Sequence, residues 1–186
     1  LFMNVIALSV SRKVQLIKSL KSACKSSSRR LFCADSSNES PALYFGDEFV
    51  IVPKINSNNL LNYLLSYCKC NHITFMLPTS DHDMVFLVDA RVVLEENGIT
   101  VLMSDSSTVS DCLSKFKFSK ICVNNNLPAP QQYHSLNNLE YPCVGKLDTS
   151  QASKGVFFIK THEDLIELLK KYNFSDFIFQ EYINSP

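Results

Sequence analysis

The sequence lacks the features expected of a membrane, nucleic-acid-binding or secreted protein. No apolar run approaches the roughly 20 residues that a helix needs to cross a bilayer. Lysine and arginine total 18, as do aspartate and glutamate, so no net charge would attract nucleic acid or a membrane surface. The 7 cysteines are an odd number for disulfide pairing, and no cleavable leader precedes the first apolar run. We therefore expect reduced thiols and a cytoplasmic protein.

Glycine and clustered metal ligands are also scarce. The 4 glycines form no Gly-x-Gly-x-x-Gly sequence after the first predicted strand, which argues against a dinucleotide-binding oxidoreductase. Cys68, Cys70 and His72 are the only cluster with metal-like spacing, but a structural zinc site needs a second, distant ligand pair. The end of a helix entering a buried strand explains these three residues better, so we assign no metal ligands.

Short apolar runs alternate with helical patterns in the first hundred residues. Strands are predicted at residues 4–9, 31–35, 49–52, 73–77 and 100–103, and helices at residues 12–24, 59–68 and 83–96. This alternation is typical of βαβ units. The expected fold class is therefore α/β, with an open, mostly parallel, Rossmann-like sheet.

The pattern changes near residue 105. One long helix is predicted over residues 106–125, and a stiff proline-containing linker follows at residues 127–130. Strands at residues 141–146, 156–160 and 176–182 and a helix at residues 163–172 complete the chain. This order is typical of a small α+β unit, so we place domains at residues 1–105 and 106–186.

The most informative segment is residues 146–156. Lys146 leaves a strand, a loop of small and polar residues follows, and Lys154 and Gly155 open the next strand. Small residues let backbone N–H groups approach a polyphosphate closely, and ammonium groups supply the opposite charge. An ordinary polar hairpin with incidental lysines is the alternative, because this is not a Walker loop and Gly155 is its only glycine.

Neighbouring segments extend this pattern. Ser114-Lys115 lies in the long helical stretch ahead of the Leu-Pro-Ala-Pro linker, and residues 179–183 (Phe-Gln-Glu-Tyr-Ile) form a strand that runs into a turn. This ordered set resembles the ATP-grasp family. Residues 40–47, 52–55 and 77–81 look like the pre-ATP-grasp domain of carbamoyl-phosphate-synthase-like ligases, so the resemblance covers nearly the whole chain.

The resemblance implies roles for particular residues. Lys115 and Lys146 resemble the two lysines that reach the nucleotide phosphates. Residues 150–155 look like the flexible loop that closes over the β- and γ-phosphates, and residues 180–183 look like the interdomain strand whose backbone meets the adenine edge. The implied nucleotide-binding residues are Lys115, Lys146, Ser150, Ser153, Lys154, Gly155, Gln180, Glu181, Tyr182 and Ile183.

The same resemblance implies a parent enzyme that uses Mg-ATP. Such a ligase activates a carboxylate as an acyl phosphate and captures it with an amine. In the family, the magnesium ligands and a phosphate-binding arginine come from the second half of the module, which would follow Pro186. The chain is therefore expected to be an N-terminal part of a ligase, with its catalytic residues unassigned. Its expected partners are nucleotide and small carboxylate and amine substrates, and a homo-oligomer remains open.

Some positions depart from the family pattern. Leu147 and Asp148 stand where relatives have a proline and an arginine, and an acid beside phosphate is repulsive unless it points away or a metal intervenes. Ser150 and Gln151 replace smaller residues, and a loop that contains glycine in relatives reads Ser-Val-Ser-Arg at residues 9–12. The second hypothesis is therefore a non-catalytic module, a degenerate nucleotide-binding or assembly domain.

Two expectations concern the local structure of the loop. The ammonium of Lys146 should be unpaired or only loosely paired when no nucleotide is bound. Residues 149–154 should form a lid that phosphate orders, or else a tight hairpin in which Asp148 bonds the backbone of Ser150 as an Asx turn.

Three acids outside this segment are weaker candidates. Asp81, Asp83 and Asp35 follow predicted strands, so they could line a substrate crevice at the carboxyl edge of the sheet. Capping of neighbouring backbone groups is the favoured role for each.

Overall fold

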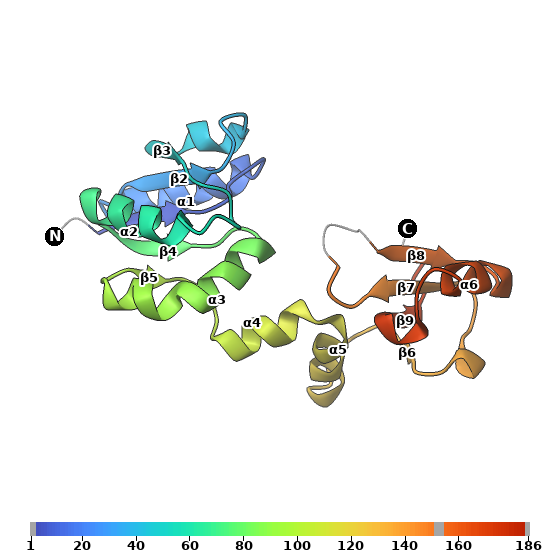
Figure 1. Cartoon of the computed structure of the whole chain (residues 1–186). Coiled ribbons are helices and arrows are strands. Elements are labelled where there is room, and N and C mark those ends of the chain that lie inside the picture. The colour runs from blue at the N-terminus through green and yellow to red at the C-terminus, as the bar shows by residue number, and fades with distance from the viewer. Residues whose placement is uncertain (1–2, 151–154, 185–186) are drawn as a thin grey trace. The chain divides into compact units, whose positions relative to one another are not determined.

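The computed structural model describes residues 3–150 and 155–184. The chain divides into two compact units, Leu1–Val109 and Ser110–Pro186 (Figure 1). The division falls in the same segment as the change of sequence pattern near residue 105.

Unit 1 is built on a five-stranded sheet with the strand order β3-β2-β1-β4-β5. Every neighbouring pair in this sheet is parallel. The strands are β1 (Asn4–Ala7), β2 (Leu31–Asp35), β3 (Glu48–Ile51), β4 (Ile73–Leu77) and β5 (Thr100–Val101). The helices are α1 (Val14–Ser26), the 3-10 helix η1 (Pro41–Phe45), α2 (Leu60–Cys70) and α3 (Asp81–Glu96).

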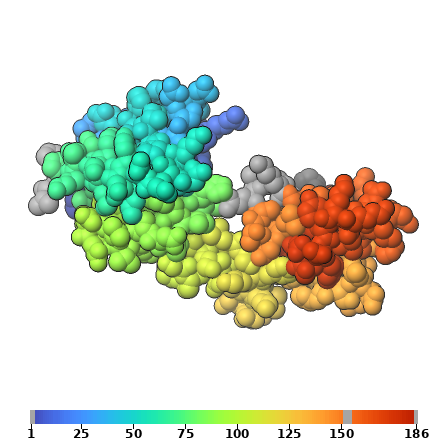
Figure 2. All heavy atoms as spheres, in the orientation of Figure 1, coloured from blue at the N-terminus to red at the C-terminus, as the bar shows by residue number. Residues whose placement is uncertain are grey.

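Helices cover both faces of this sheet. All residues of β1 and β2 are buried, as expected of strands that read as continuous apolar runs. One core cluster joins the sheet to α2 and α3 through residues such as Leu64 and Leu87. The other joins it to α1 and η1 through Ile17 and Leu43. Atoms of α2 and α3 form the teal and green face of unit 1 seen in Figure 2.

Unit 2 has a four-stranded antiparallel sheet with the order β6-β9-β7-β8. Its strands are β6 (Gln132–Tyr133), β7 (Cys143–Leu147), β8 (Val156–Ile159) and β9 (Phe177–Glu181). Its helices are α5 (Lys115–Asn124), α6 (His162–Leu169) and the 3-10 helices η2 (Leu136–Asn138) and η3 (Phe174–Asp176), while α4 (Ser106–Leu113) spans the division between the units. Phe179, Leu165 and neighbouring apolar residues form the core between the sheet and α6.

The predicted fold class is confirmed, with a parallel α/β sheet followed by a small mixed unit. The prediction of a single helix over residues 106–125 is wrong, because the helix breaks at Ser114. That residue has an extended backbone, and its hydroxyl accepts the N–H of Lys117 at 3.2 Å as the N-cap of α5. The strand β6 was not predicted, since two residues are too short to show a pattern.

The cysteines are free thiols. Cys70 and Cys112 are exposed, and the other five are buried. Burial raises the pKa of Cys68 to about 12 and is the main cause that raises the pKa values of Cys33 and Cys143 to about 11. Among the residues that the structure describes, no group of three or more His, Cys, Asp or Glu side chains could hold a metal ion, and no helix is long and apolar enough to span a bilayer.

Candidate functional site

Lys115, the first residue of α5, holds the beginning of the β7–β8 loop. Its ammonium donates to the carbonyl oxygens of Leu147 at 2.8 Å, Asp148 at 2.7 Å and Ser150 at 2.8 Å. Burial lowers the pKa of Lys115; the carboxylate of Asp148 opposes this shift, and the nearby charge of Lys146 adds to it. The two lysines predicted to bind phosphate thus lie at the same end of the β7–β8 loop.

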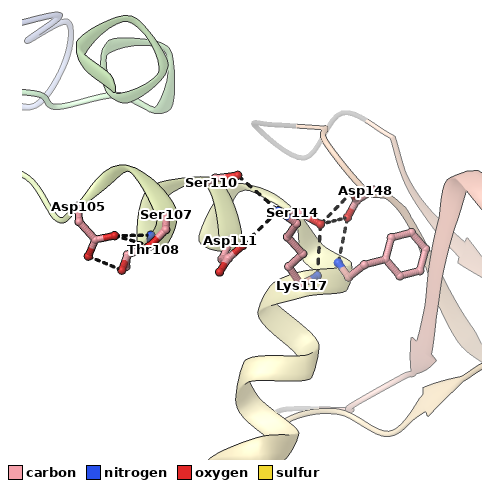
Figure 3. Close-up of polar contacts among 9 residues, drawn as sticks. Asp105, Ser107, Thr108, Ser110, Asp111, Ser114, Lys117 and Asp148 are labelled. Carbon is pink, nitrogen blue, oxygen red and sulfur yellow. Dashed lines mark hydrogen bonds and ion pairs between the residues drawn. The ribbon is translucent and has the colours of Figure 1, made fainter. Parts of the chain in front are cut away.

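Asp148 turns its carboxylate away from the loop and onto the N-terminus of α5 (Figure 3). Its Oδ1 accepts the backbone N–H of Phe116 at 2.9 Å, and the hydroxyl of Ser114 lies 3.1 Å and 3.0 Å from its two oxygens. The positive end of the helix dipole favours a carboxylate here. The Asx turn considered for this residue is not formed, since the N–H of Ser150 donates to the carbonyl of Leu147 at 3.4 Å instead.

Lys146 lies on β7 and points to the sheet face opposite the core of unit 2. Its ammonium donates to Oε1 of Gln180 on β9 at 2.9 Å. Within residues 3–150 and 155–184, no carboxylate lies within 4.0 Å of this ammonium. Its described partner is therefore a neutral amide, which agrees with the expected loose pairing.

The same sheet face carries exposed apolar side chains. Lys146 is paired with Val156 across the β7–β8 ladder, and Val144 is paired with Phe158. Val156 is 42% exposed, Phe158 47% and Tyr182 42%. The rings of Phe158 and Tyr182 lie 4.6 Å apart between centroids. An exposed apolar surface formed by Val156, Phe158 and Tyr182 therefore lies on the same sheet face as Lys146.

The end of β9 is fixed at Glu181 and then leaves the sheet. The backbone N–H of Glu181 donates to the carbonyl of Gln131 at 2.9 Å, and Oε1 of Glu181 accepts the N–H of Gln131 at 2.8 Å. Tyr182 and Ile183 follow the last residue of the strand and are exposed. Their backbone groups lie beyond the sheet ladder, where a ligand could bond to them.

Gly155 closes the other end of the loop. Its φ is +70°, and a Cβ at this position would lie 2.7 Å from Cδ1 of Leu147. Its carbonyl accepts the N–H of Leu147 at 2.9 Å. Both the backbone conformation and the close approach therefore require glycine. At the first end, the hydroxyl of Ser150 donates to the Leu147 carbonyl at 2.9 Å. Ser153, Lys154 and most of the lid expected at residues 149–154 lie outside the described residues.

The structure thus brings most of the predicted residues together around one loop and one sheet face. Lys115, Lys146, Ser150 and Gly155 meet at the loop, and Gln180 contacts Lys146 directly. Sequence reasoning missed the fixing of Asp148 by α5 and the apolar surface at Phe158. A serine directly before a helical pattern is an N-cap signal, so Ser114 could have revealed where α5 begins.

The comparisons with known proteins agree on family and fold. Residues 5–102 match the family model described as PylC-like, N-terminal domain. No curated protein sequence matches the chain significantly.

Several solved structures share the fold. N5-carboxyaminoimidazole synthetase from Staphylococcus aureus, complexed with ADP, is similar with a TM-score of 0.72 at 16% identity, over 100% of this chain and 49% of that one. N5-carboxyaminoimidazole ribonucleotide synthetase from Thermotoga maritima is similar with a TM-score of 0.67 at 17% identity, over 98% of this chain and 47% of that one. L-amino acid ligase from Bacillus licheniformis is similar with a TM-score of 0.67 at 16% identity, over 99% of this chain and 45% of that one.

The chain therefore spans about half the length of these ligases, and at such low identity the likeness shows the fold alone. The predicted resemblance to ATP-grasp ligases is confirmed at that level, whereas the finer likeness to carbamoyl-phosphate synthase stays a prediction. The chain belongs to the PylC-like N-terminal domain family, and its fold is that of the first part of an ATP-grasp ligase.

Proposed function

We propose that unit 2 binds ATP and that the whole protein is an ATP-dependent carboxylate–amine ligase. The carrying observation is that Lys115 and Lys146 lie at the start of the β7–β8 loop, where the described hydrogen-bond partners of both ammonium groups are neutral. An ammonium group gains a stronger, charge-assisted hydrogen bond from an anion than from a neutral acceptor. A polyphosphate would supply that anion to Lys146.

Each part of the site has a chemical role in this proposal. Lys146 would leave the neutral amide of Gln180 for a phosphate oxygen, because a charge-assisted hydrogen bond is stronger than one to a neutral acceptor. Lys115 would keep the carbonyls at the beginning of the loop in place. The apolar surface at Phe158 and Tyr182 would face the base, and the backbone beyond Glu181 would offer the paired donor and acceptor that adenine requires.

Magnesium is part of the proposal, although none of the residues described here is assigned to it. When bound, Mg-ATP supplies the phosphoryl group that turns a carboxylate into an acyl phosphate, which an amine then captures. Positioning and electrostatic stabilisation are the protein's contribution to such a transfer. The first and second units would be the pre-ATP-grasp domain and the first ATP-grasp subdomain, in a cytoplasmic protein with small-molecule partners that is open to homo-oligomerisation.

A second candidate is a non-catalytic module that keeps the fold and binds nucleotide weakly or not at all. The bonds of Lys115 to three carbonyls favour it, because they use all three donors of the ammonium. This candidate predicts that changing Lys146 has no effect on nucleotide binding.

The test is Lys146→Ala in the full-length protein. We expect loss of about 2–4 kcal/mol of transition-state stabilisation, as for removal of a phosphate-stabilising group, measured as the drop in kcat/KM for ATP. Lys171→Ala, at an exposed position beyond α6, is the matched control and should leave kcat/KM unchanged. Equal kinetics for Lys146→Ala and wild type would remove Lys146 from the site, whereas a full-length wild-type protein without ATP-dependent ligase activity would favour the non-catalytic module.

A further inference from the structure

Unit 1 contains a cavity of about 540 Å³ at the carboxyl edge of its parallel sheet. The segments that line it follow β1, β2, β3 and β4, and the beginning of α2 forms one wall. The strand order reverses at β1, which has β2 on one side and β4 on the other. Open α/β sheets bind ligands at such a switch point, and the volume lies within the range of about 300–1,000 Å³ that is usual for small-molecule sites.

The two acids in the cavity wall are already satisfied by neighbouring donors. Asp83 is 1% exposed, and its carboxylate accepts the Ser9 hydroxyl at 2.6 Å and the N–H groups of Thr79 at 3.1 Å and Ser80 at 3.0 Å. Its favoured capping role is therefore confirmed by a complete capping box at the start of α3.

Asp35 is bonded in the same way at the end of β2. It is 8% exposed, and it accepts the N–H groups of Ser11 at 2.8 Å and Ser37 at 3.1 Å. Backbone N–H donors thus hold each carboxylate in place. Both acids therefore serve as fixed parts of the wall.

The polar capacity that remains in the cavity is rich in donors. Lys13 uses one donor on the carbonyl of Ser9 at 3.0 Å, which leaves two of its three N–H groups. Lys54 is exposed, and within residues 3–150 and 155–184 its ammonium has no carboxylate within 4.0 Å. The side chains of Asn56 and Ser36 add further donors at the rim. A ligand that matches these donors is rich in acceptors, and a negatively charged group on it fits the two ammonium groups of Lys13 and Lys54.

The cavity also has apolar lining. Val52 and Pro53 are partly exposed and Ile55 is exposed, whereas Leu60 and Leu64 are already buried. An apolar body on the three accessible residues would remove their area from water, whereas a bare inorganic anion would leave that area hydrated.

We propose that this cavity binds a small organic anion, with its carboxylate or phosphate at Lys13 and Lys54 and its apolar body on Val52, Pro53 and Ile55. The proposal concerns unit 1 alone and does not depend on the nucleotide site of unit 2.

The experiment is a titration of the whole chain with four probes, followed by the backbone amide signals in ¹H–¹⁵N spectra. Isocaproate and isoamyl phosphate carry the two candidate head groups on a branched apolar body. Isocaproamide has the same body without charge, and inorganic phosphate has the charge without the body. At least one organic anion should shift the amide signals of Ser36, Lys54 and His82 until they saturate. Of isocaproate and isoamyl phosphate, the one that binds with higher affinity identifies the preferred head group.

The matched variants are Lys54→Gln in the cavity and Lys69→Gln, an exposed lysine near the end of α2 at the other edge of the sheet. Loss of one charge-assisted contact should weaken binding about tenfold, whereas Lys69→Gln should not change it. The neutral amide should bind about tenfold more weakly than the matching acid.

Three outcomes would overturn the proposal. An affinity for isocaproamide equal to that for the anions would show that the negative charge does not contribute to binding. Inorganic phosphate binding as well as the organic anions would show that the apolar lining is not used. An unchanged affinity in Lys54→Gln, with its spectrum otherwise that of the folded wild type, would show that the cavity cation is not involved.

Discussion

Replacement of Asp148 tests whether this acid stabilises α5, as the structure indicates. Asp148→Ala removes an acceptor that lies 2.9 Å from the Phe116 N–H and also contacts the Ser114 hydroxyl. A side-chain acceptor at a helix N-terminus contributes about 0.5–2 kcal/mol, and its negative charge about 0.3–1 kcal/mol. Because the two contributions overlap, we expect the free energy of unfolding to fall by about 1–2 kcal/mol.

The assay is urea unfolding followed by far-ultraviolet circular dichroism, together with hydrogen exchange of the Phe116 amide. Asp148→Asn keeps one acceptor and loses the charge, so it should cost less than Asp148→Ala. Thr149→Ala is the control, since Thr149 is the exposed next residue, and its effect should lie within about 0.5 kcal/mol. Wild-type stability and unchanged exchange at Phe116 in Asp148→Ala would refute the reasoning.

Two further predictions concern backbone conformation. Gly155→Ala should destabilise the chain by about 2 kcal/mol or more, because a left-handed alanine is strained and its Cβ would meet Leu147 at 2.7 Å. Gly98→Ala is the control, since Gly98 has φ +76° and no atom within 4 Å of the added Cβ. In the same urea assay it should show only the cost of the strained backbone. Ser11 has φ 44°, so Ser11→Gly should stabilise the chain by up to about 1 kcal/mol. Thermal unfolding checks this, with Ser11→Ala as a control that keeps the strain, and equal melting temperatures for the two variants would contradict it.

The architecture of unit 1 could be predicted because its signals are local. The runs at β1 and β2 are apolar throughout, and both strands are buried at every position. The end of α3 was equally clear, since Asn97-Gly98 is a stop signal and Gly98 has the positive φ that it implies. Boundaries shifted by a few residues where strands fray into loops.

The details of the candidate site depend on contacts between distant segments. The resemblance to the ATP-grasp family implied that Lys115 and Lys146 belong to one site, but no local pattern shows that Lys115 bonds three carbonyls more than thirty residues away. The orientation of Asp148 was likewise open, because it depends on where α5 begins. Ser114 sets that start, and the long helical pattern concealed it.

The distribution of thiols has a practical consequence for measuring motion. Cys70 lies in the first unit and Cys112 in the second, and both are exposed. The other five thiols are buried, which shields them from a bulky reagent. Burial also raises the pKa values of Cys33, Cys68 and Cys143, which lowers their reactive thiolate fraction further. Maleimide labelling of the unaltered sequence should therefore place one dye on each unit. A donor–acceptor pair at these two positions would report, by energy transfer, how the units move when ligand is added.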